Sequence, residues 1–207
     1  WGLFATSHAI HPFHVDSEGQ GTWIMPRTGR KYWVVAVPAL ESDFGSTVTF
    51  GKKFRVDGHN GQNWSLYGFI LEPGDLLIMP PCTPHFVLTP NSSISHGGHF
   101  YSSLSMTRTA YSFFHNFVAA DTITNTIDYN ALEGLYSIAA FWHHSIVKDS
   151  ATYLHKLSQA EHTCAGLDII VHLPNFLVLD DLINFLSLVN LVKLGTVLDI
   201  RRYREES

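Results

Sequence analysis

Residues 14–38, HVDSEGQGTWIMPRTGRKYWVVAVP, begin with His14-Val15-Asp16 and continue into a run rich in β-branched and aromatic residues. In an extended strand, residues two apart point to the same face, so His14 and Asp16 would present an imidazole and a carboxylate side by side. Two histidines and one carboxylate on one face of a metal suit non-haem Fe(II), because three coordination positions stay open. The stretch therefore predicts two of three metal ligands, although a solvated polar pair also explains an isolated His-x-Asp.

The composition predicts one globular domain, alone or with an appendage. Of the 207 residues, 45% are hydrophobic and 15% are charged, which is typical of a chain with a well-buried core. The formal net charge is −5, and no run is rich in Lys or Arg. We therefore do not expect a large phosphate-binding surface or a nucleic-acid partner.

The cysteines predict no disulfide framework. Cys82 and Cys164 form neither a CxxC motif nor a zinc-binding spacing, so we expect an intracellular protein of the nucleus or cytoplasm. Two glycosylation sequons, residues 63–65 and 91–93, leave a secreted origin open. The chain begins at Trp1 rather than Met, so we expect that an N-terminal part is missing and draw nothing from the lack of a targeting peptide.

The first half of the chain, residues 1–105, has the pattern of an antiparallel β domain. Short runs rich in Val, Ile, Phe, Tyr and Trp are separated by Gly, Pro, Asn and Asp at hairpin spacing. Glu72-Pro73-Gly74-Asp75 has Pro and Gly at the two central positions of a type II turn. The pattern predicts a jelly-roll sandwich or barrel, with strands at 11–16, 21–26, 31–37, 47–50, 66–71, 75–79, 85–89 and 94–100.

Residues 106–207 predict an α-helical C-terminal region. A last helix follows Pro174 and runs from Asn175 to about Arg204. It is apolar around most of its circumference, and such a helix is normally buried, either in a helical bundle or dimer interface or as an ordinary core helix. Polar residues interrupt every 18-residue window of it, so we expect no membrane span. Apolar residues at helical spacing predict further helices at 110–120, 129–147 and 150–164. The polar stripe of the last helix consists of Asp180, Asp181, Asn184, Ser187, Asn190 and Lys193.

A second candidate histidine follows residues 71–81, LEPGDLLIMPP, which read as a turn, a strand and a proline-rich corner. Thr83-Pro84-His85 follow this segment closely, at the start of the next predicted strand. A lone histidine after a proline is usually a loop residue. In a double-stranded β-helix, however, a histidine here can reach across the barrel to a His-x-Asp on an early strand, so His85 is the candidate third ligand.

A candidate anchor for an anion lies in residues 29–33, GRKYW, which open a strand. A buried lysine ammonium is costly unless it meets a carboxylate, and a bound dicarboxylate would be such a partner for Lys31. A surface lysine at the entry of a strand explains the pattern equally well, and Arg27 and Arg30 are also available. Strand alternation predicts that one face carries Lys31, Trp33, Val35 and Val37.

Taken together, these motifs resemble the Jumonji C (JmjC) branch of the cupin-fold Fe(II)/2-oxoglutarate oxygenases. The resemblance covers about residues 11–101 and implies a double-stranded β-helix catalytic core within residues 1–105. It also suggests uncharacterised fungal JmjC-like proteins as near relatives. The helical half resembles the family only in its general helical character. Helical extensions that dimerise are common in the family, so a homodimer through these helices is expected. The motifs are His14-x-Asp16, Gly29-x-Lys31-x-Trp33…Pro38, Pro73-Gly74-Asp75…Pro80…His85 and Ser93-Ile94…His99-Phe100.

The resemblance implies a role for each matching residue. His14, Asp16 and His85 become the ligands of Fe(II), and Lys31 pairs with the distal carboxylate of 2-oxoglutarate.

Further positions match the family less closely. Thr22, with Trp23 beside it, falls where the family often places a polar contact to the cosubstrate. His99 stands where relatives often have Asn, and the resemblance implies that it hydrogen-bonds the cosubstrate or the residues around the metal ligands. His11 stands where some relatives have a Thr that contacts the cosubstrate. These departures leave open a rival metal set that includes His11, His96 or His99.

The function implied is an Fe(II)- and 2-oxoglutarate-dependent oxygenase that oxidises a C–H bond and releases succinate and CO2. His-x-Asp is typical of the family's hydroxylases, whereas many histone demethylases carry His-x-Glu, so the resemblance favours a hydroxylase acting on a protein or a small molecule. The alternatives are a JmjC-type lysine demethylase, a metal-dependent cupin enzyme that uses no 2-oxoglutarate, and a non-catalytic JmjC-like scaffold.

Overall fold

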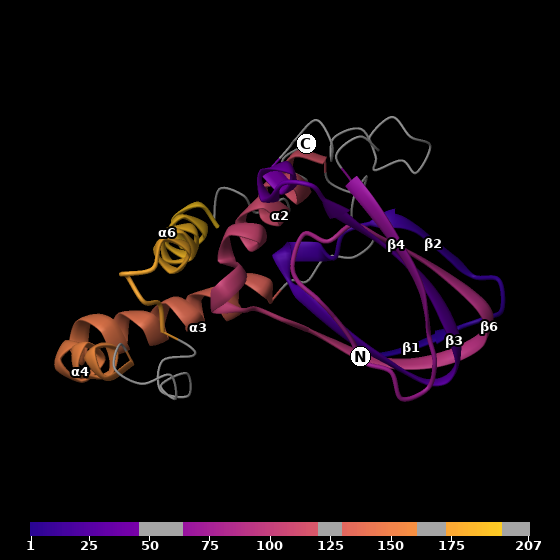
Figure 1. Cartoon of the computed structure of the whole chain (residues 1–207), viewed down its shortest axis with the longest axis horizontal. Helices are drawn as coiled ribbons and strands as arrows, with labels where there is room; N and C mark the ends of the chain where they lie inside the picture. Colours follow the sequence, from indigo (N-terminus) through magenta and orange to yellow (C-terminus); the bar gives the residue numbers. More distant parts are fainter. Residues whose placement is uncertain (46–63, 120–129, 161–172, 196–207) are drawn as a thin grey trace.

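The structure, a computed structural model, describes residues 1–45, 64–119, 130–160 and 173–195. Within these residues the strands form one antiparallel sheet in the order β1-β6-β3-β4, while β2 also pairs with β6 and β5 with β3 (Figure 1). The antiparallel β architecture expected of the first half is therefore confirmed. The strands are β1 (Gly2–Ala5), β2 (Ile10–His14), β3 (Gly21–Pro38), β4 (Trp64–Leu71), β5 (Leu77–Met79) and β6 (His85–Phe100).

Two long strands, β3 and β6, pair with each other and carry the rest of the sheet. The sequence predicts each of them as two shorter strands, which is wrong because pairing between β3 and β6 continues through both expected breaks. The pairing register slips between Pro26 and Tyr32, and Gly29 has a φ of 71° there. A Cβ at Gly29 would clash with the carbonyl oxygen of Ser92, so glycine permits the close approach at this bend.

The other strands differ from the prediction mainly at their ends. Strand β2 stops at His14 rather than at residue 16, and β5 starts at Leu77 rather than at residue 75. Strand β1 is not predicted, because its four residues show no pattern of their own and are held by pairing with residues 93–96 of β6. The predicted strand at 47–50 lies outside the described residues.

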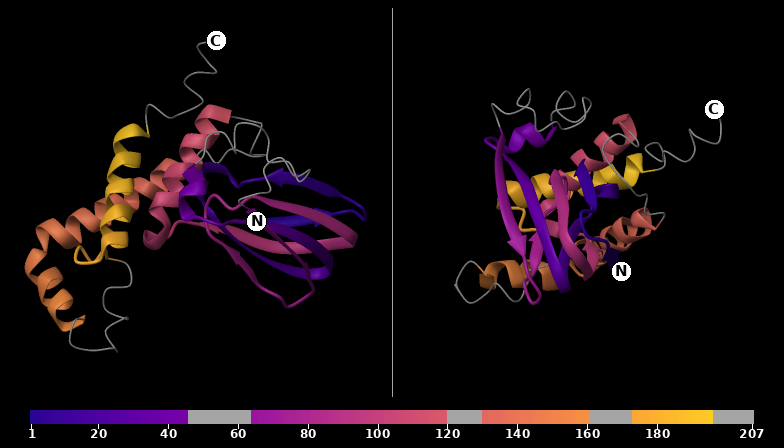
Figure 2. Two further views of the ribbon diagram at one scale, coloured as in Figure 1. Left: turned by 45° about the horizontal axis from the view of Figure 1, so that its top comes forward. Right: turned by 90° about the vertical axis from the view of Figure 1, so that its right-hand side faces the viewer.

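In the described part of the chain four helices follow the sheet, and they overlap the helical segments predicted from periodicity. Helix α2 contacts both η1, the short turn after β2, and α6, so it lies between the sheet and the other helices (Figure 2). Within the described residues, every helix is too short or too polar to span a bilayer. The helices are α2 (Met106–Ala119), α3 (Ala131–His143), α4 (Ser150–Ala160) and α6 (Leu179–Leu194), and the short turns are η1 (Ser17–Gly19), η2 (Glu41–Gly45), η3 (Ser103–Ser105) and η5 (His144–Lys148).

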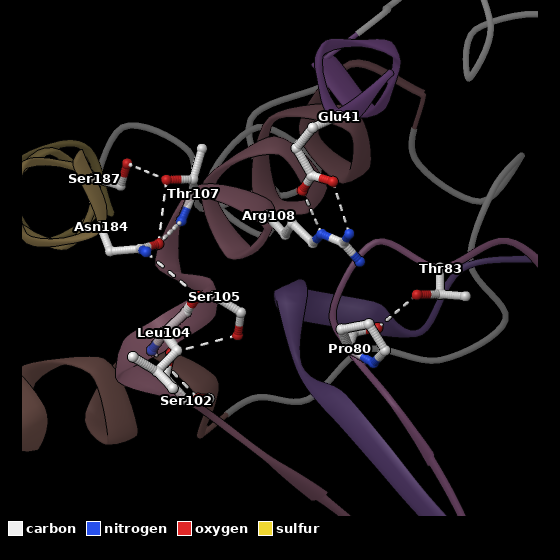
Figure 3. Close-up of polar contacts among 10 residues, drawn as sticks. All are labelled: Glu41, Pro80, Thr83, Ser102, Leu104, Ser105, Thr107, Arg108, Asn184 and Ser187. Atoms are coloured by element: carbon white, nitrogen blue, oxygen red, sulfur yellow. Dashed lines mark hydrogen bonds and ion pairs between the residues drawn. The ribbon is translucent and has the colours of Figure 1, made fainter. Parts of the chain in front are cut away.

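The polar stripe of helix α6 is exposed at Asp180, Asn190 and Lys193 but not at Asn184. Asn184 is buried, and its Oδ1 accepts hydrogen bonds from the backbone N–H and the hydroxyl of Thr107 on α2 (Figure 3). By contrast, Leu179 and Leu186 of the same helix are 68% and 50% exposed. A polar residue is buried at position 184 because the start of α2 presents polar groups that an apolar side chain could not satisfy. The predicted homodimer through these helices stays a prediction.

Each half of the molecule has its own group of buried side chains. Within the sheet, one group surrounds Trp33 and packs between β3, β5 and β6. The second group joins α2, α3 and α6. The sheet group consists of Ile24, Trp33, Leu71, Met79 and Val87, and the helical group includes Met106, Phe113, Leu135, Trp142, Leu188 and Leu191.

Candidate metal centre

The three predicted ligands, His14, Asp16 and His85, lie together with their ligand atoms within 4.8 Å of one another. Oδ1 of Asp16 is 4.0 Å from Nε2 of His14 and 3.8 Å from Nε2 of His85. Asp16 lies beyond the end of β2, but its backbone stays extended, so it shares a face with His14 as the spacing predicts. No other group of three such side chains occurs in the part of the chain that the structure describes, and the rival metal set is therefore not formed there.

The two histidines come from neighbouring strands. His14 on β2 is the direct cross-strand partner of His85 on β6, and their ring centroids are 4.2 Å apart. The sequence predicts that His85 reaches across a barrel, whereas the structure places it beside His14. The indole of Trp33 stacks on the His85 ring at a centroid distance of 5.2 Å, which restricts its rotation.

Backbone carbonyls orient both imidazoles. Nδ1 of His14 lies 2.8 Å from the carbonyl oxygen of Pro12, and Nδ1 of His85 lies 2.9 Å from that of Thr83. Because a carbonyl oxygen only accepts, each Nδ1 carries the proton and each Nε2 keeps its lone pair for a metal. The sequence contains no signal for these contacts, since a carbonyl belongs to every residue.

Electrostatics favours the protonation states that a metal requires. Burial and the neighbouring His85 lower the pKa of His14 to about 4. Burial alone would raise the pKa of Asp16, but His85, the Thr22 hydroxyl and His14 together bring it below its usual value. The His14 imidazole is therefore neutral and the Asp16 carboxylate ionised at neutral pH, as metal coordination needs.

Both loops that carry ligands contain a left-handed residue that is not glycine. Glu18, two residues after Asp16, has a φ of 55°, and Cys82, three before His85, has a φ of 60°. Such conformations cost on the order of 1–3 kcal/mol and persist where the surroundings enforce them. At Glu18, the hydroxyl of Tyr101 donates to the carbonyl oxygen at 2.9 Å. Both left-handed residues thus lie within three residues of a candidate ligand.

A cavity of about 510 Å³ extends from the ligands to Lys31. Lys31 is fully buried and donates to the Thr89 hydroxyl at 2.9 Å, and burial lowers its pKa. No carboxylate among the described residues forms an ion pair with it. The buried indole N–H of Trp33, two residues along the same strand, also has no acceptor among the residues that the structure describes. Lys31 therefore gives this cavity a buried cation that has no paired carboxylate among the described residues.

The remaining predicted residues lie on different faces of the sheet. Thr22 and His99 line the cavity, as does His11, whose pKa is lowered by burial and by Lys31. Trp23 is not among the lining residues, and its ring packs edge-on against His96 at 5.1 Å. The structure does not bring Trp23 to the site, because successive residues of a strand point to opposite faces.

Thr89, which contacts the cavity-lining Lys31, was not predicted from the sequence. On β6, His85, Val87 and Thr89 are all buried, and they alternate with less buried neighbours. This period of two was the available signal, since it places Thr89 on the same face as the candidate ligand His85. Its hydroxyl is the hydrogen-bond partner of Lys31.

Comparisons with known proteins find distant similarity. No family model matches the chain. Over 105 residues, the chain is 31% identical to JmjC domain-containing histone demethylation protein 1 of Caenorhabditis elegans and 30% identical to the protein of the same name from Caenorhabditis briggsae. The match takes in 50% of this chain and 10% of each relative. Half of the chain is thus similar to a small part of much longer JmjC-containing proteins.

Two solved structures are also similar, both of CENP-C from Drosophila melanogaster. Its complex with CAL1 matches with a TM-score of 0.33 and 8% identity, over 48% of this chain and 59% of that chain. The CENP-C cupin domain matches with a TM-score of 0.32 and 8% identity, over 48% and 58%.

Proposed function

We propose that this chain is an Fe(II)- and 2-oxoglutarate-dependent oxygenase of the JmjC type, with its β-strands forming a jelly-roll cupin core. One observation carries the proposal: a two-histidine, one-carboxylate set shares a cavity with a buried lysine that has no carboxylate partner among the described residues. The similarity of half of the chain to JmjC-containing proteins supports it.

The donor set fits Fe(II). His14 and His85 each present Nε2, and Asp16 offers Oδ1 as an anionic oxygen, so three open positions would remain on a six-coordinate ion. The carbonyls of Pro12 and Thr83 hold the imidazoles in the tautomer that binds a metal. When bound, Fe(II) and 2-oxoglutarate supply the oxidising power by decarboxylation of 2-oxoglutarate to succinate and CO2, coupled to oxidation of a C–H bond by dioxygen.

The part of the cavity beside Lys31 fits the distal carboxylate of 2-oxoglutarate. A carboxylate at Lys31 would neutralise a buried ammonium, and its oxygens could accept from the Trp33 indole N–H. Ile24 and Val87 contribute apolar walls to the same cavity. In this setting, an ion pair with Lys31 is shielded from water and is stronger than one at the surface.

Hydroxylation of a C–H bond is the reaction that we favour, because His14-x-Asp16 resembles the hydroxylases of the family. Lysine demethylation is the second candidate, and it is supported by the names of the relatives, which are histone demethylation proteins. The two share their chemistry, since hydroxylation of an N-methyl group gives an unstable product that loses formaldehyde. With such relatives, we also propose a nuclear location.

The experiment that tests the proposal is anaerobic addition of Fe(II) and then 2-oxoglutarate to the purified chain. We expect the visible charge-transfer band of the iron chelate in the wild type and its loss in His14→Ala. His96→Ala is the matched control, because His96 packs against Trp23, away from the cavity lining, and this variant should keep the band. No band in the wild type, or an unchanged band in His14→Ala, would contradict the assignment.

Product analysis separates the two reactions. Succinate release on addition of candidate peptides or metabolites identifies a substrate in either case. Formaldehyde release in equal amount identifies demethylation, whereas succinate without formaldehyde identifies hydroxylation of another C–H bond.

A further inference from the structure

The two oxygens of the Asp16 carboxylate have different surroundings. Oδ1 lies within 4.0 Å of Nε2 of both candidate histidine ligands. Oδ2 instead accepts a hydrogen bond from the hydroxyl of Thr22. One oxygen therefore faces the metal position, and the other is held by a neutral donor.

The number of available protons fixes which atom donates in each of these hydrogen bonds. The Thr22 oxygen also lies 3.0 Å from Nδ1 of His99. A hydroxyl has a single proton, and a carboxylate can only accept, so Thr22 donates to Asp16. Its oxygen must then accept from His99, whose Nδ1 carries a proton. Hydrogen bonds run from His99 to Thr22 and from Thr22 to Asp16.

Strand register brings this chain of hydrogen bonds together. Thr22 on β3 and His99 on β6 are direct cross-strand partners, although 77 residues separate them. Both line the cavity, and Thr22 is almost fully buried. The position of the Thr22 hydroxyl is therefore set by the sheet, and a buried donor beside Asp16 has little freedom to turn away.

We propose that Thr22 and His99 are positioning residues that keep Asp16 bound to the metal through Oδ1 alone. This inference rests on the function proposed above. A cosubstrate that binds through two oxygens needs, together with dioxygen, three open positions on the metal. If Asp16 chelated with both oxygens, it would occupy a fourth position and compete with 2-oxoglutarate. The Thr22 hydroxyl prevents this by occupying Oδ2.

Thr22→Val tests the inference, because valine has the shape of threonine and lacks the donor. The measurements are the dissociation constants for Fe(II) and, by titration of the charge-transfer band under anaerobic conditions, for 2-oxoglutarate. We expect the affinity for 2-oxoglutarate to fall by about 10- to 100-fold, the range found when outer contacts of metal ligands are removed. Fe(II) affinity should fall less, because Oδ2 becomes free to bind the ion. Thr22→Ser restores the donor and should match the wild type.

His99 supplies a second pair of variants that does not depend on a change at a buried position. His99→Leu removes the donor to Thr22 and should weaken 2-oxoglutarate binding, whereas His99→Asn keeps an N–H donor and should bind more tightly than His99→Leu. If the wild type binds Fe(II) and 2-oxoglutarate but Thr22→Val and His99→Leu have wild-type affinities, the positioning role is wrong and the proposed function stands. If the wild type binds neither, the proposed function itself fails.

Discussion

Thr109 of helix α2 donates its hydroxyl proton to the carbonyl oxygen of Gly19, at a distance of 2.8 Å and three residues after the candidate ligand Asp16. Tyr101, just before the helices, donates to the adjacent carbonyl of Glu18. None of the residues that line the candidate cavity comes from α2, α3, α4 or α6. The described part of the helical region therefore contributes to the metal centre indirectly, by holding the loop that follows Asp16.

Gly19→Ala should displace this loop. Gly19 has a φ of 61°, and a Cβ there would lie 2.5 Å from the carbonyl oxygen of Thr109. We expect a loss of about 1–3 kcal/mol in the free energy of unfolding, measured with urea, together with weaker Fe(II) binding. Gly74→Ala is the control, because Gly74 also has a positive φ but nothing within 4 Å of its Cβ position. Equal effects of the two substitutions on Fe(II) binding would show that the contact with α2 does not position Asp16.

Lys31→Met should separate stability from cosubstrate binding. It removes a buried ammonium whose pKa is lowered by burial, so the metal-free protein should be as stable as the wild type or more stable. The affinity for 2-oxoglutarate should fall by about 2 kcal/mol or more, roughly 30-fold in Kd, because the carboxylate loses its cation. Fe(II) affinity should not change.

Arg30→Met is the matched control for Lys31→Met, because Arg30 is the preceding residue, is exposed and pairs with Glu72. It should leave 2-oxoglutarate binding unchanged. Full activity of Lys31→Met would instead favour a metal-dependent cupin enzyme that does not use 2-oxoglutarate.

Stability should fall as the pH drops below about 6.5. Burial lowers the pKa values of His11, His14 and His115, that of His14 to about 4. Above pH 6.5 these imidazoles are neutral in both states, whereas below it the unfolded chain takes up protons that the folded protein does not. The free energy of unfolding then falls by up to about 1.4 kcal/mol per pH unit for each histidine, and for His14 the fall ends near pH 4.

Urea unfolding of the metal-free protein at pH 7 and pH 5 measures this dependence. His14→Gln should show a smaller difference between the two pH values than the wild type, because it lacks one of the titrating groups. A wild-type protein that is equally stable at pH 7 and pH 5 would contradict the prediction.

Asn184→Leu should destabilise the contact between α2 and α6. The substitution leaves the backbone N–H of Thr107 and the carbonyl of Leu104 without their partner (Figure 3). Each buried polar group without a partner costs about 1–3 kcal/mol, so a loss of at least this size is expected in urea unfolding. Asn190→Leu, at an exposed position of the same helix, should change stability by less than about 0.5 kcal/mol. A comparable loss in both variants would rule out the role of the Asn184 network.

Local spacing was sufficient to identify the candidate ligands. His14 and Asp16 share a face because an extended chain repeats every two residues, and this holds although Asp16 lies outside the strand. The turn around Gly74 and the proline corner placed His85 at the start of a strand, where the structure has it. These features depend only on neighbours along the chain.

Contacts between strands required the fold. From the sequence, Lys31 could equally be a surface residue or a buried one. Only the pairing of β3 with β6 places the Thr89 hydroxyl beside its ammonium group. Thr22 and Trp23 were both predicted to lie at the cosubstrate site. In the sheet, however, the Thr22 hydroxyl contacts Asp16 and the Trp23 ring packs against His96. Register between distant strands depends on bulges and on the burial of whole faces, so it cannot be derived from the spacing of residues within one strand.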